Sequence, residues 1–247
     1  MKLFFFIIFI SSSVNAKNNN EVFQIANSLM VKEKYNEAVK AYESIMYDEP
    51  LSCDVFYNLG NAYYKLDSLG FAAWAYSKAN LICPRNEDVI YNLNLVKSKL
   101  LGEIKLPNKF LLQKFYTKIR DSFTFLEFLF IGALMTMLFF LFNFFRNNIY
   151  NQRVFYGSIN VGLLSLVFLI NILTLNKFTT IKKVEAIVVD RSSKLYSEPF
   201  SVNGTVLLVI NQGERIEIIE KKGNWSQVRI NFNSEKGWVQ DNSYIEL

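Results

Sequence analysis

The sequence predicts a multidomain protein with α, membrane and β parts: an N-terminal α-helical repeat domain, a two-helix transmembrane hairpin and a small C-terminal β-barrel. Three observations support this prediction. Matching residues recur at a distance of 34 near the N-terminus, two long apolar runs follow, and short β-type runs separated by turn residues begin at Val184. These patterns are typical of helical repeats, membrane helices and small barrels, respectively.

The first 16 residues have the pattern of a signal peptide. Lys2 provides a positive start, and the apolar run Leu3–Ile10 is too short to cross a bilayer. Val14 and Ala16 occupy the small-residue positions before a cleavage site. The sequence therefore predicts export of the segment that follows, with an uncleaved N-terminal anchor as the alternative.

Residues 17–101 are expected to form the helical repeat domain. Pairs that match at a distance of 34 are Ala38 with Ala72, Tyr42 with Tyr76, Pro50 with Pro84, Tyr57 with Tyr91, Asn58 with Asn92, and Leu59 with Leu93. The period, the small residues and the closing prolines resemble the tetratricopeptide repeat family. The resemblance implies two repeats, residues 19–52 and 53–86, and a polar capping helix over 88–100.

The tetratricopeptide resemblance also implies a concave partner-binding groove. The groove positions hold aromatic side chains, two amides and one cation: Phe23, Asn27, Tyr57, Asn61, Tyr64, Lys65 and Tyr91. Some relatives hold a partner's C-terminal carboxylate here, but Phe23, Tyr57 and Tyr91 replace the basic residues of that clamp. An aromatic groove with amide hydrogen bonds suits an extended or helical peptide. The alternative is that the tyrosines only pack between neighbouring helices.

The chain has two cysteines, Cys53 and Cys83, which the repeat pattern places at one end of a helix hairpin. A disulfide is possible in an oxidising periplasm. Two thiols are the expectation we favour, because two cysteines form no disulfide framework and lack zinc-ligand spacing.

Residues 123–145 and 154–175 are each long enough to cross a bilayer as a helix. Asn160 and Asn171 are candidates for hydrogen bonds between the two helices. The loop 146–153 carries two arginines and no acid, which places it in the cytoplasm. The basic linker 102–122 conflicts with this orientation, but the signal peptide commits the N-terminal domain to the periplasm first. We therefore expect a two-pass protein of the bacterial inner membrane with both flanking domains in the periplasm.

Residues 184–247 are expected to form the barrel. Five β-type runs are Ala186–Val189, Val206–Ile210, Arg215–Glu220, Trp225–Ile230 and Gly237–Gln240. Gly223-Asn224-Trp225 with Val228, and Gly237-Trp238-Val239, resemble elements of the bacterial SH3-like family. The resemblance implies a ligand face on Trp238, Trp225 and Tyr196 that takes peptides or cell-wall glycan. Trp225 is expected mainly in the core, and Trp238 half-exposed as the better ligand candidate.

The composition argues against enzyme chemistry. The chain has no histidine, no glycine-rich phosphate loop and no nucleophile with a recognisable base beside it. We expect neither a catalytic residue nor a cofactor nor a metal site. The net charge of +5 fits a membrane surface better than nucleic acid, because the densest basic group precedes an apolar run.

The order of these segments resembles the BatE-like family, the tetratricopeptide members of the Bacteroides aerotolerance (Bat) group. The segment from Tyr57 to Leu66 looks especially like that family. The resemblance implies a non-catalytic envelope scaffold whose partners include von Willebrand A-domain membrane proteins and a MoxR-type ATPase. The alternative function is a peptidoglycan-binding anchor that acts through the SH3-like domain.

Overall fold

The computed structural model describes residues 19–48, 50–101, 111–146, 153–199, 205–230 and 235–247. The predicted signal peptide and nearly all of the predicted cytoplasmic loop lie outside these residues. The chain forms two compact units, one from Met1–Leu106 with Val184–Leu247 and one from Pro107–Lys183. The first unit is called the helix–sheet unit below, and the second the apolar unit.

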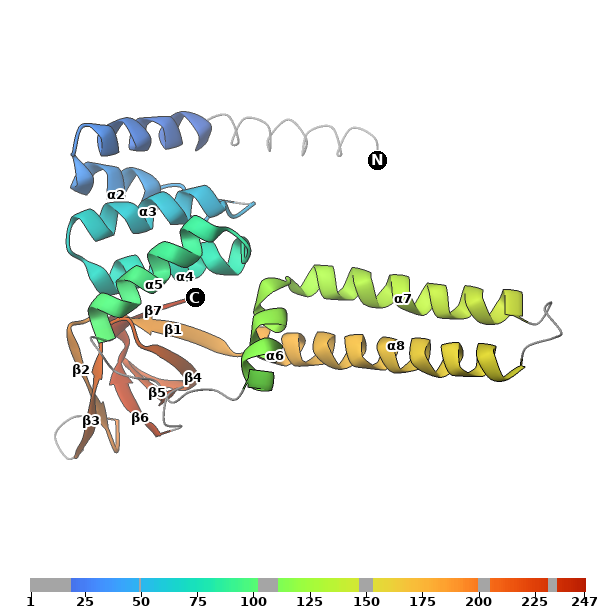
Figure 1. Cartoon of the computed structure of the whole chain (residues 1–247). Helices are drawn as coiled ribbons and strands as arrows, with labels where there is room; N and C mark the ends of the chain where they lie inside the picture. The colour runs from blue at the N-terminus through green and yellow to red at the C-terminus, as the bar shows by residue number, and fades with distance from the viewer. Residues whose placement is uncertain (1–18, 49, 102–110, 147–152, 200–204, 231–234) are drawn as a thin grey trace, which may run out of the picture. The chain divides into compact units, whose positions relative to one another are not determined.

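The N-terminal part of the helix–sheet unit is a stack of helices (Figure 1). A helix over 19–31 is followed by α2 (Tyr35–Glu43), α3 (Cys53–Lys65), α4 (Leu69–Ile82) and α5 (Glu87–Leu101). Successive helices from α2 to α5 pack on one another. Their buried faces carry alanines and aromatics such as Ala38, Ala72 and Tyr76, which allow close approach with a large buried area.

The backbone of this stack repeats at the predicted distance of 34 residues. Glu33 and Asp67, both in helix-to-helix turns, have positive φ angles of 58° and 55°. The residue after each turn donates its amide to a carbonyl five residues earlier, Lys34 to Leu29 and Ser68 to Tyr63, both at 2.9 Å. Two helical hairpins with the same turn geometry therefore follow one another, as the sequence period predicts.

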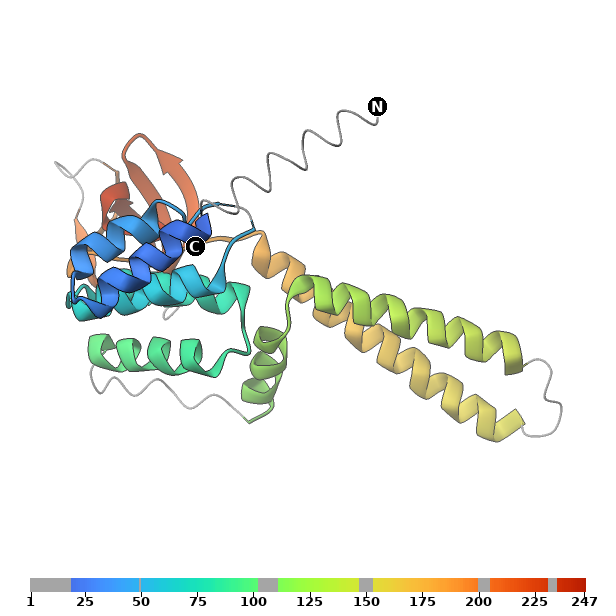
Figure 2. The ribbon, with the colours of Figure 1, turned by 90° about the horizontal axis from the view of Figure 1, so that it is seen from above.

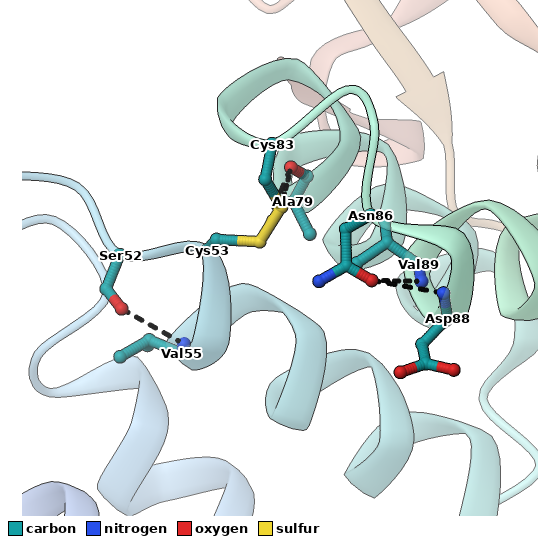
Figure 3. Close-up of a disulfide and its surroundings, with 8 residues drawn as sticks. All are labelled: Ser52, Cys53, Val55, Ala79, Cys83, Asn86, Asp88 and Val89. Carbon is teal, nitrogen blue, oxygen red and sulfur yellow. Dashed lines mark hydrogen bonds between the residues drawn. A yellow bond between two sulfur atoms is a disulfide. The ribbon is translucent and has the colours of Figure 1, made fainter.

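A disulfide joins the two helices of the second hairpin (Figure 3). Cys53 is the first residue of α3 and Cys83 follows the last residue of α4, so the bond closes the open end of the hairpin. Ser52 beside it accepts the Val55 amide and caps α3. Our preference for two thiols was wrong, because the antiparallel helices bring the two cysteine Cα atoms to 6.1 Å, within the usual range for a disulfide.

The apolar unit holds α6 (Leu111–Ser122), α7 (Phe125–Arg146) and α8 (Arg153–Ile181). α7 and α8 are long and apolar enough to cross a membrane, and only 11% and 6% of their most apolar stretches are buried. The core helix of a soluble protein would be mostly buried, so the two helices favour a membrane protein. They lie side by side in both views (Figures 1 and 2).

Details of the apolar unit differ from the prediction. The segment expected to be a linker contains α6, and α7 begins at Phe125 instead of residue 123. α8 continues to Ile181, beyond the predicted end at residue 175. Of the two candidate amides, Asn160 bridges the helices by accepting Asn143 Nδ2 at 2.9 Å, whereas Asn171 donates to a carbonyl of its own helix.

The C-terminal part of the helix–sheet unit is a seven-stranded antiparallel sheet in the order β3-β2-β6-β5-β4-β1-β7. The strands are β1 (Val184–Val188), β2 (Ser192–Tyr196), β3 (Val206–Asn211), β4 (Arg215–Lys222), β5 (Trp225–Ile230), β6 (Lys236–Gln240) and β7 (Tyr244–Glu246). Leu195, Ile210 and Val228, from three different strands, are fully buried in one core. The small β domain is therefore as expected, with two strands more than the five runs predicted.

The helices and the sheet share a second hydrophobic core. Ile187 of β1 is buried in the same cluster as Trp74 of α4, and Ile245 and Leu247 pack against that cluster. The Trp74 indole donates a hydrogen bond from Nε1 to the backbone carbonyl of Glu246 at 2.9 Å. The repeat domain and the β domain were expected as separate modules, but this contact makes them one packed unit.

The shared unit carries a partly buried lysine whose charge opposes folding. Burial, and secondarily the Arg215 cation, lower the pKa of Lys97 from 10.5 to about 8. The unfolded chain therefore binds more protons between pH 8 and 10.5, so stability rises with pH there. We expect Lys97→Met to raise the free energy of unfolding at pH 7 by on the order of 2 kcal/mol, with the gain shrinking toward pH 10.5.

Denaturant unfolding of the full chain at pH 7 and 10.5 measures this effect. Lys65→Met, at an exposed position of α3, is the matched control and should change little. A gain for Lys97→Met that does not depend on pH would show that the lysine is already neutral or well solvated.

Candidate functional site

Asn27, a predicted groove residue, belongs to a hydrogen-bond network between helices. Its side-chain oxygen Oδ1 accepts the Tyr42 hydroxyl at 2.6 Å and Asn58 Nδ2 at 3.1 Å. Tyr42 lies on α2 and Asn58 on α3. One amide oxygen therefore ties the first helix to the two that follow it.

The same arrangement recurs 34 residues later around Asn61, another predicted groove residue. Asn61 Oδ1 accepts the Tyr76 hydroxyl at 2.7 Å and Asn92 Nδ2 at 3.2 Å. Asn92 Nδ2 also lies 3.2 Å from the Tyr57 hydroxyl, so Tyr57 joins the network. These residues recur because each repeat needs the same polar link to the next one.

Burial determines the protonation state of the tyrosines in this network. Burial raises the pKa of Tyr42 to about 12, and it also raises the pKa of Tyr76 above the usual range. Both hydroxyls therefore keep their protons at neutral pH and act as donors. Asn27 and Asn61 each accept two hydrogen bonds within the stack. Their side-chain oxygens therefore have no acceptor capacity left for a partner.

The other predicted groove residues differ in exposure. Tyr91 on α5 is 68% exposed, and Lys65 at the end of α3 is exposed. Tyr64 is half-buried with the Lys99 ammonium 4.4 Å from its ring centre. Phe23 is half-buried against Tyr42, with ring centres 6.0 Å apart. Tyr91 and Lys65 are therefore the predicted groove residues whose side chains are most accessible to a partner.

In the sheet, the three predicted ligand-face residues lie together. Tyr196 on β2 pairs in register with Trp238 on β6, and its ring meets the Trp225 ring edge-on with centres 5.3 Å apart. Side chains alternate between the two faces of a strand. Trp225 and Trp238 therefore lie opposite the core residues Val228 and Val239 of their strands, on the outer face of the sheet.

One expectation for these tryptophans was wrong, because Trp238 is 8% exposed and not half-exposed. Trp225, at 7%, is buried as expected, although it lies outside the cluster of Leu195, Ile210 and Val228. Large flat side chains on neighbouring strands cover each other, which removes most of their surface from water. Tyr196 keeps more of its surface accessible than either tryptophan.

Sequence reasoning missed three residues of these surfaces. Asn58 and Asn92 were noticed only as matching pairs in the period, although that recurrence was the available signal. Lys99 was assigned to a solvating cap, and no spacing pattern indicated its contact with Tyr64. Among the described residues, no cluster of three or more histidine, cysteine, aspartate or glutamate side chains could hold a metal ion.

The C-terminal sheet, with its aromatic outer face and tight strand turns, has the features of a small SH3-like binding domain. Comparison with known families agrees with this class: residues 194–246 match the bacterial SH3 domain family. Domains of this kind often bind the cell wall or other proteins. A comparison with curated proteins found no match to the chain.

Proposed function

We propose that the chain is a non-catalytic, membrane-anchored scaffold of the bacterial cell envelope. Its helical hairpins act as tetratricopeptide-type repeats that hold a partner, and its bacterial SH3 domain makes a second contact. Two modest contacts on one anchored chain increase the overall avidity. The resemblance to the BatE-like family suggests a Bat-type complex, with von Willebrand A-domain membrane proteins and a MoxR-type ATPase as candidate partners.

The observation that most supports this proposal is the shared core of the helices and the sheet. The apolar helices α7 and α8 lie between these two parts in the chain, yet Trp74 and Glu246 are in direct contact. Parts that pack together must lie on the same side of a membrane. A chain that crosses the membrane twice between the two parts returns to the same side, whereas a single crossing would separate them. The contact therefore supports the two-pass topology.

The disulfide supports the periplasmic side. Disulfides persist in oxidising compartments such as the periplasm and are rare in the cytosol. Cys53 and Cys83 belong to the helix–sheet unit, so their bond supports a location of that whole unit outside the cytoplasm. It agrees with the signal peptide and with the arginines predicted to lie in a cytoplasmic loop.

The partner-binding surface can be tested with residues that the stack does not need. Tyr91→Ala with Lys65→Ala removes the exposed aromatic and the exposed cation and leaves the asparagine network intact. If Tyr91 is a hot spot, its loss costs about 2 kcal/mol, or about thirtyfold in affinity. Co-purification of partners from gently solubilised membranes measures this loss.

Tyr47→Ala with Lys40→Ala is the matched control, since it removes the same residue types at exposed positions outside the predicted groove. The control should retain the partners. Equal recovery with both double variants would contradict binding at the Tyr91 and Lys65 surface.

A second candidate function, peptidoglycan anchoring, is favoured by the match to the bacterial SH3 domain family and by the outer aromatic face. The two functions differ in which surface matters. Tyr196→Ala should abolish binding of the detergent-solubilised full chain to purified sacculi if the sheet is the anchor. If the unmodified chain does not bind sacculi, the scaffold is the better proposal.

A further inference from the structure

α6, the helix that the sequence did not predict, lies crosswise at one end of the α7–α8 hairpin (Figures 1 and 2). It lies at the end where α7 begins and α8 ends. If α7 and α8 run through a bilayer, a crosswise helix at this end lies along the membrane surface. The contacts and side chains of α6 distinguish a membrane-surface helix from a simple connector.

One set of contacts separates α6 from α7, and one hydrogen bond holds α6 to the hairpin. The helical conformation is interrupted at Thr124. The Thr124 amide donates to Glu127 Oε2 at 2.8 Å, and Thr124 Oγ1 accepts the Glu127 amide at 3.3 Å. This reciprocal pair is a capping box that starts α7 as a new helix. Lys177 of α8 donates from Nζ to the backbone carbonyl of Arg120 at 3.1 Å and so ties the end of α6 to the hairpin.

The side chains of α6 suit a boundary between lipid and water. Leu111 and Phe115, one turn apart, are 81% and 65% exposed. Ile119 continues the same apolar side and is half-buried. Lys118, seven residues after Leu111, lies at the Leu111 edge of this apolar side, whereas Arg120 is a little over one-quarter turn beyond Ile119 at its other edge. In water, two large exposed apolar side chains on one helix would be unfavourable.

The cations at this end of the hairpin are not confined to α6. Lys182, just past the end of α8, lies with its ammonium 4.4 Å from the Phe178 ring centre. The one acid of α6, Asp121, is paired with Arg120 at 2.8 Å. The combination of exposed apolar side chains with excess positive charge matches the negative phosphates and the acyl chains of an anionic membrane.

We propose that α6 is an interfacial helix that binds the surface of an anionic phospholipid membrane. Leu111 and Phe115 enter the boundary between headgroups and acyl chains, while Lys118, Arg120 and Lys182 contact lipid phosphates. A lipid occupant follows from continuity, because α6 joins the membrane-spanning α7 directly at the capping box. The assignment also gives Lys118 and Arg120, two of the basic residues before α7, a role other than setting the orientation of the membrane helices.

The proposal rests on the membrane crossing of α7 and α8, and the test separates the two claims. Phe115→Trp in the full chain, placed in nanodiscs of phosphatidylglycerol, should be quenched more by lipids brominated near the headgroup than by lipids brominated near the chain end. Leu134→Trp, in the middle of α7, should show the opposite order. Unmodified chain gives the background from the three native tryptophans, which all lie in the helix–sheet unit.

The charge requirement is tested in the same assay. Replacing phosphatidylglycerol with phosphatidylcholine, or adding Lys118→Gln and Arg120→Gln, should cause loss of the quenching seen with the Phe115→Trp variant. The matched control is Lys32→Gln with Lys40→Gln, on the exposed surface of the helical stack. This control should leave the quenching unchanged. The Lys177 bond survives the Arg120 change because it uses the backbone carbonyl.

Three results would overturn the proposal. Quenching of the Leu134→Trp variant without quenching of the Phe115→Trp variant would place α6 away from lipid while leaving the membrane hairpin intact. Equal quenching of the Phe115→Trp variant in both lipids would show that anionic headgroups are not recognised. Absence of quenching in the Leu134→Trp variant would remove the membrane hairpin itself, and the proposed function with it.

Discussion

Trp74→Ala is expected to destabilise the helix–sheet unit by about 3–5 kcal/mol. Trp74 is 1% exposed, packs edge-on against Phe56, and donates its indole proton to the Glu246 carbonyl. The substitution removes a large buried side chain from the core that joins helices to sheet, and leaves a backbone acceptor without its donor. Because both parts depend on that core, they should unfold together at a lower denaturant concentration.

Two probes measure this effect in the full chain. Far-ultraviolet circular dichroism follows the helices, while fluorescence of the remaining Trp225 and Trp238 follows the sheet. Trp74→Phe keeps most of the buried area and loses the hydrogen bond, so it should cost only about 1 kcal/mol from that bond, plus a small packing loss. Tyr91→Ala, an exposed aromatic on α5, should stay within about 0.5 kcal/mol of the unmodified chain. Two separate transitions in the unmodified chain would contradict the shared core.

The helical part could be predicted well because its signals are local and repeated. The period from Tyr42 to Tyr76 and from Asn58 to Asn92 identified both hairpins, and the structure shows these residues in equivalent hydrogen bonds. The sequence did not show whether the asparagine side chains face a binding partner or the neighbouring helix. An asparagine on a groove-facing helix looks the same whether it serves a partner or the next helix, since the difference depends on the position of a neighbouring tyrosine.

In the sheet, the strands that were missed lack a clear pattern of their own. β2 reads Ser-Ser-Lys-Leu-Tyr and has one large buried side chain, Leu195, and β7 is three residues long. Such strands are determined by their partners and not by local propensity. The structure nevertheless brings Tyr196 together with the two tryptophans that the family resemblance grouped with it.

The contact between helices and sheet could not be predicted from the sequence. Ile187, Ile245 and Leu247 look like ordinary strand residues, and nothing in their spacing indicates that they cover Trp74. α6 was missed for a related reason. Its polar side chains resemble a linker, and its apolar side chains become meaningful only once the helix is seen at the end of an apolar hairpin.

Removal of the Cys53–Cys83 disulfide is expected to lower the free energy of unfolding of the helix–sheet unit by about 3–4 kcal/mol. The bond closes a loop with a sequence separation of 30, and closure of a loop of that length restricts the unfolded chain by about this amount. The cross-link also holds together the start of α3 and the end of α4, where helix ends fray most easily. Denaturant unfolding of the full chain, followed by fluorescence of its three tryptophans, measures the change for Cys53→Ala with Cys83→Ala.

Reduction provides the matched control, since it removes the bond without changing the sequence. Dithiothreitol should destabilise the unmodified chain by nearly the same amount as the double substitution, and it should have no effect on the double variant. If the double variant is destabilised but the reductant changes nothing in the unmodified chain, the loss comes from packing of the cysteine side chains, and the bond is absent in the protein. In that case the disulfide no longer supports an oxidising compartment for the helix–sheet unit, and the proposed topology would rest on the contact between Trp74 and Glu246 together with the sequence signals.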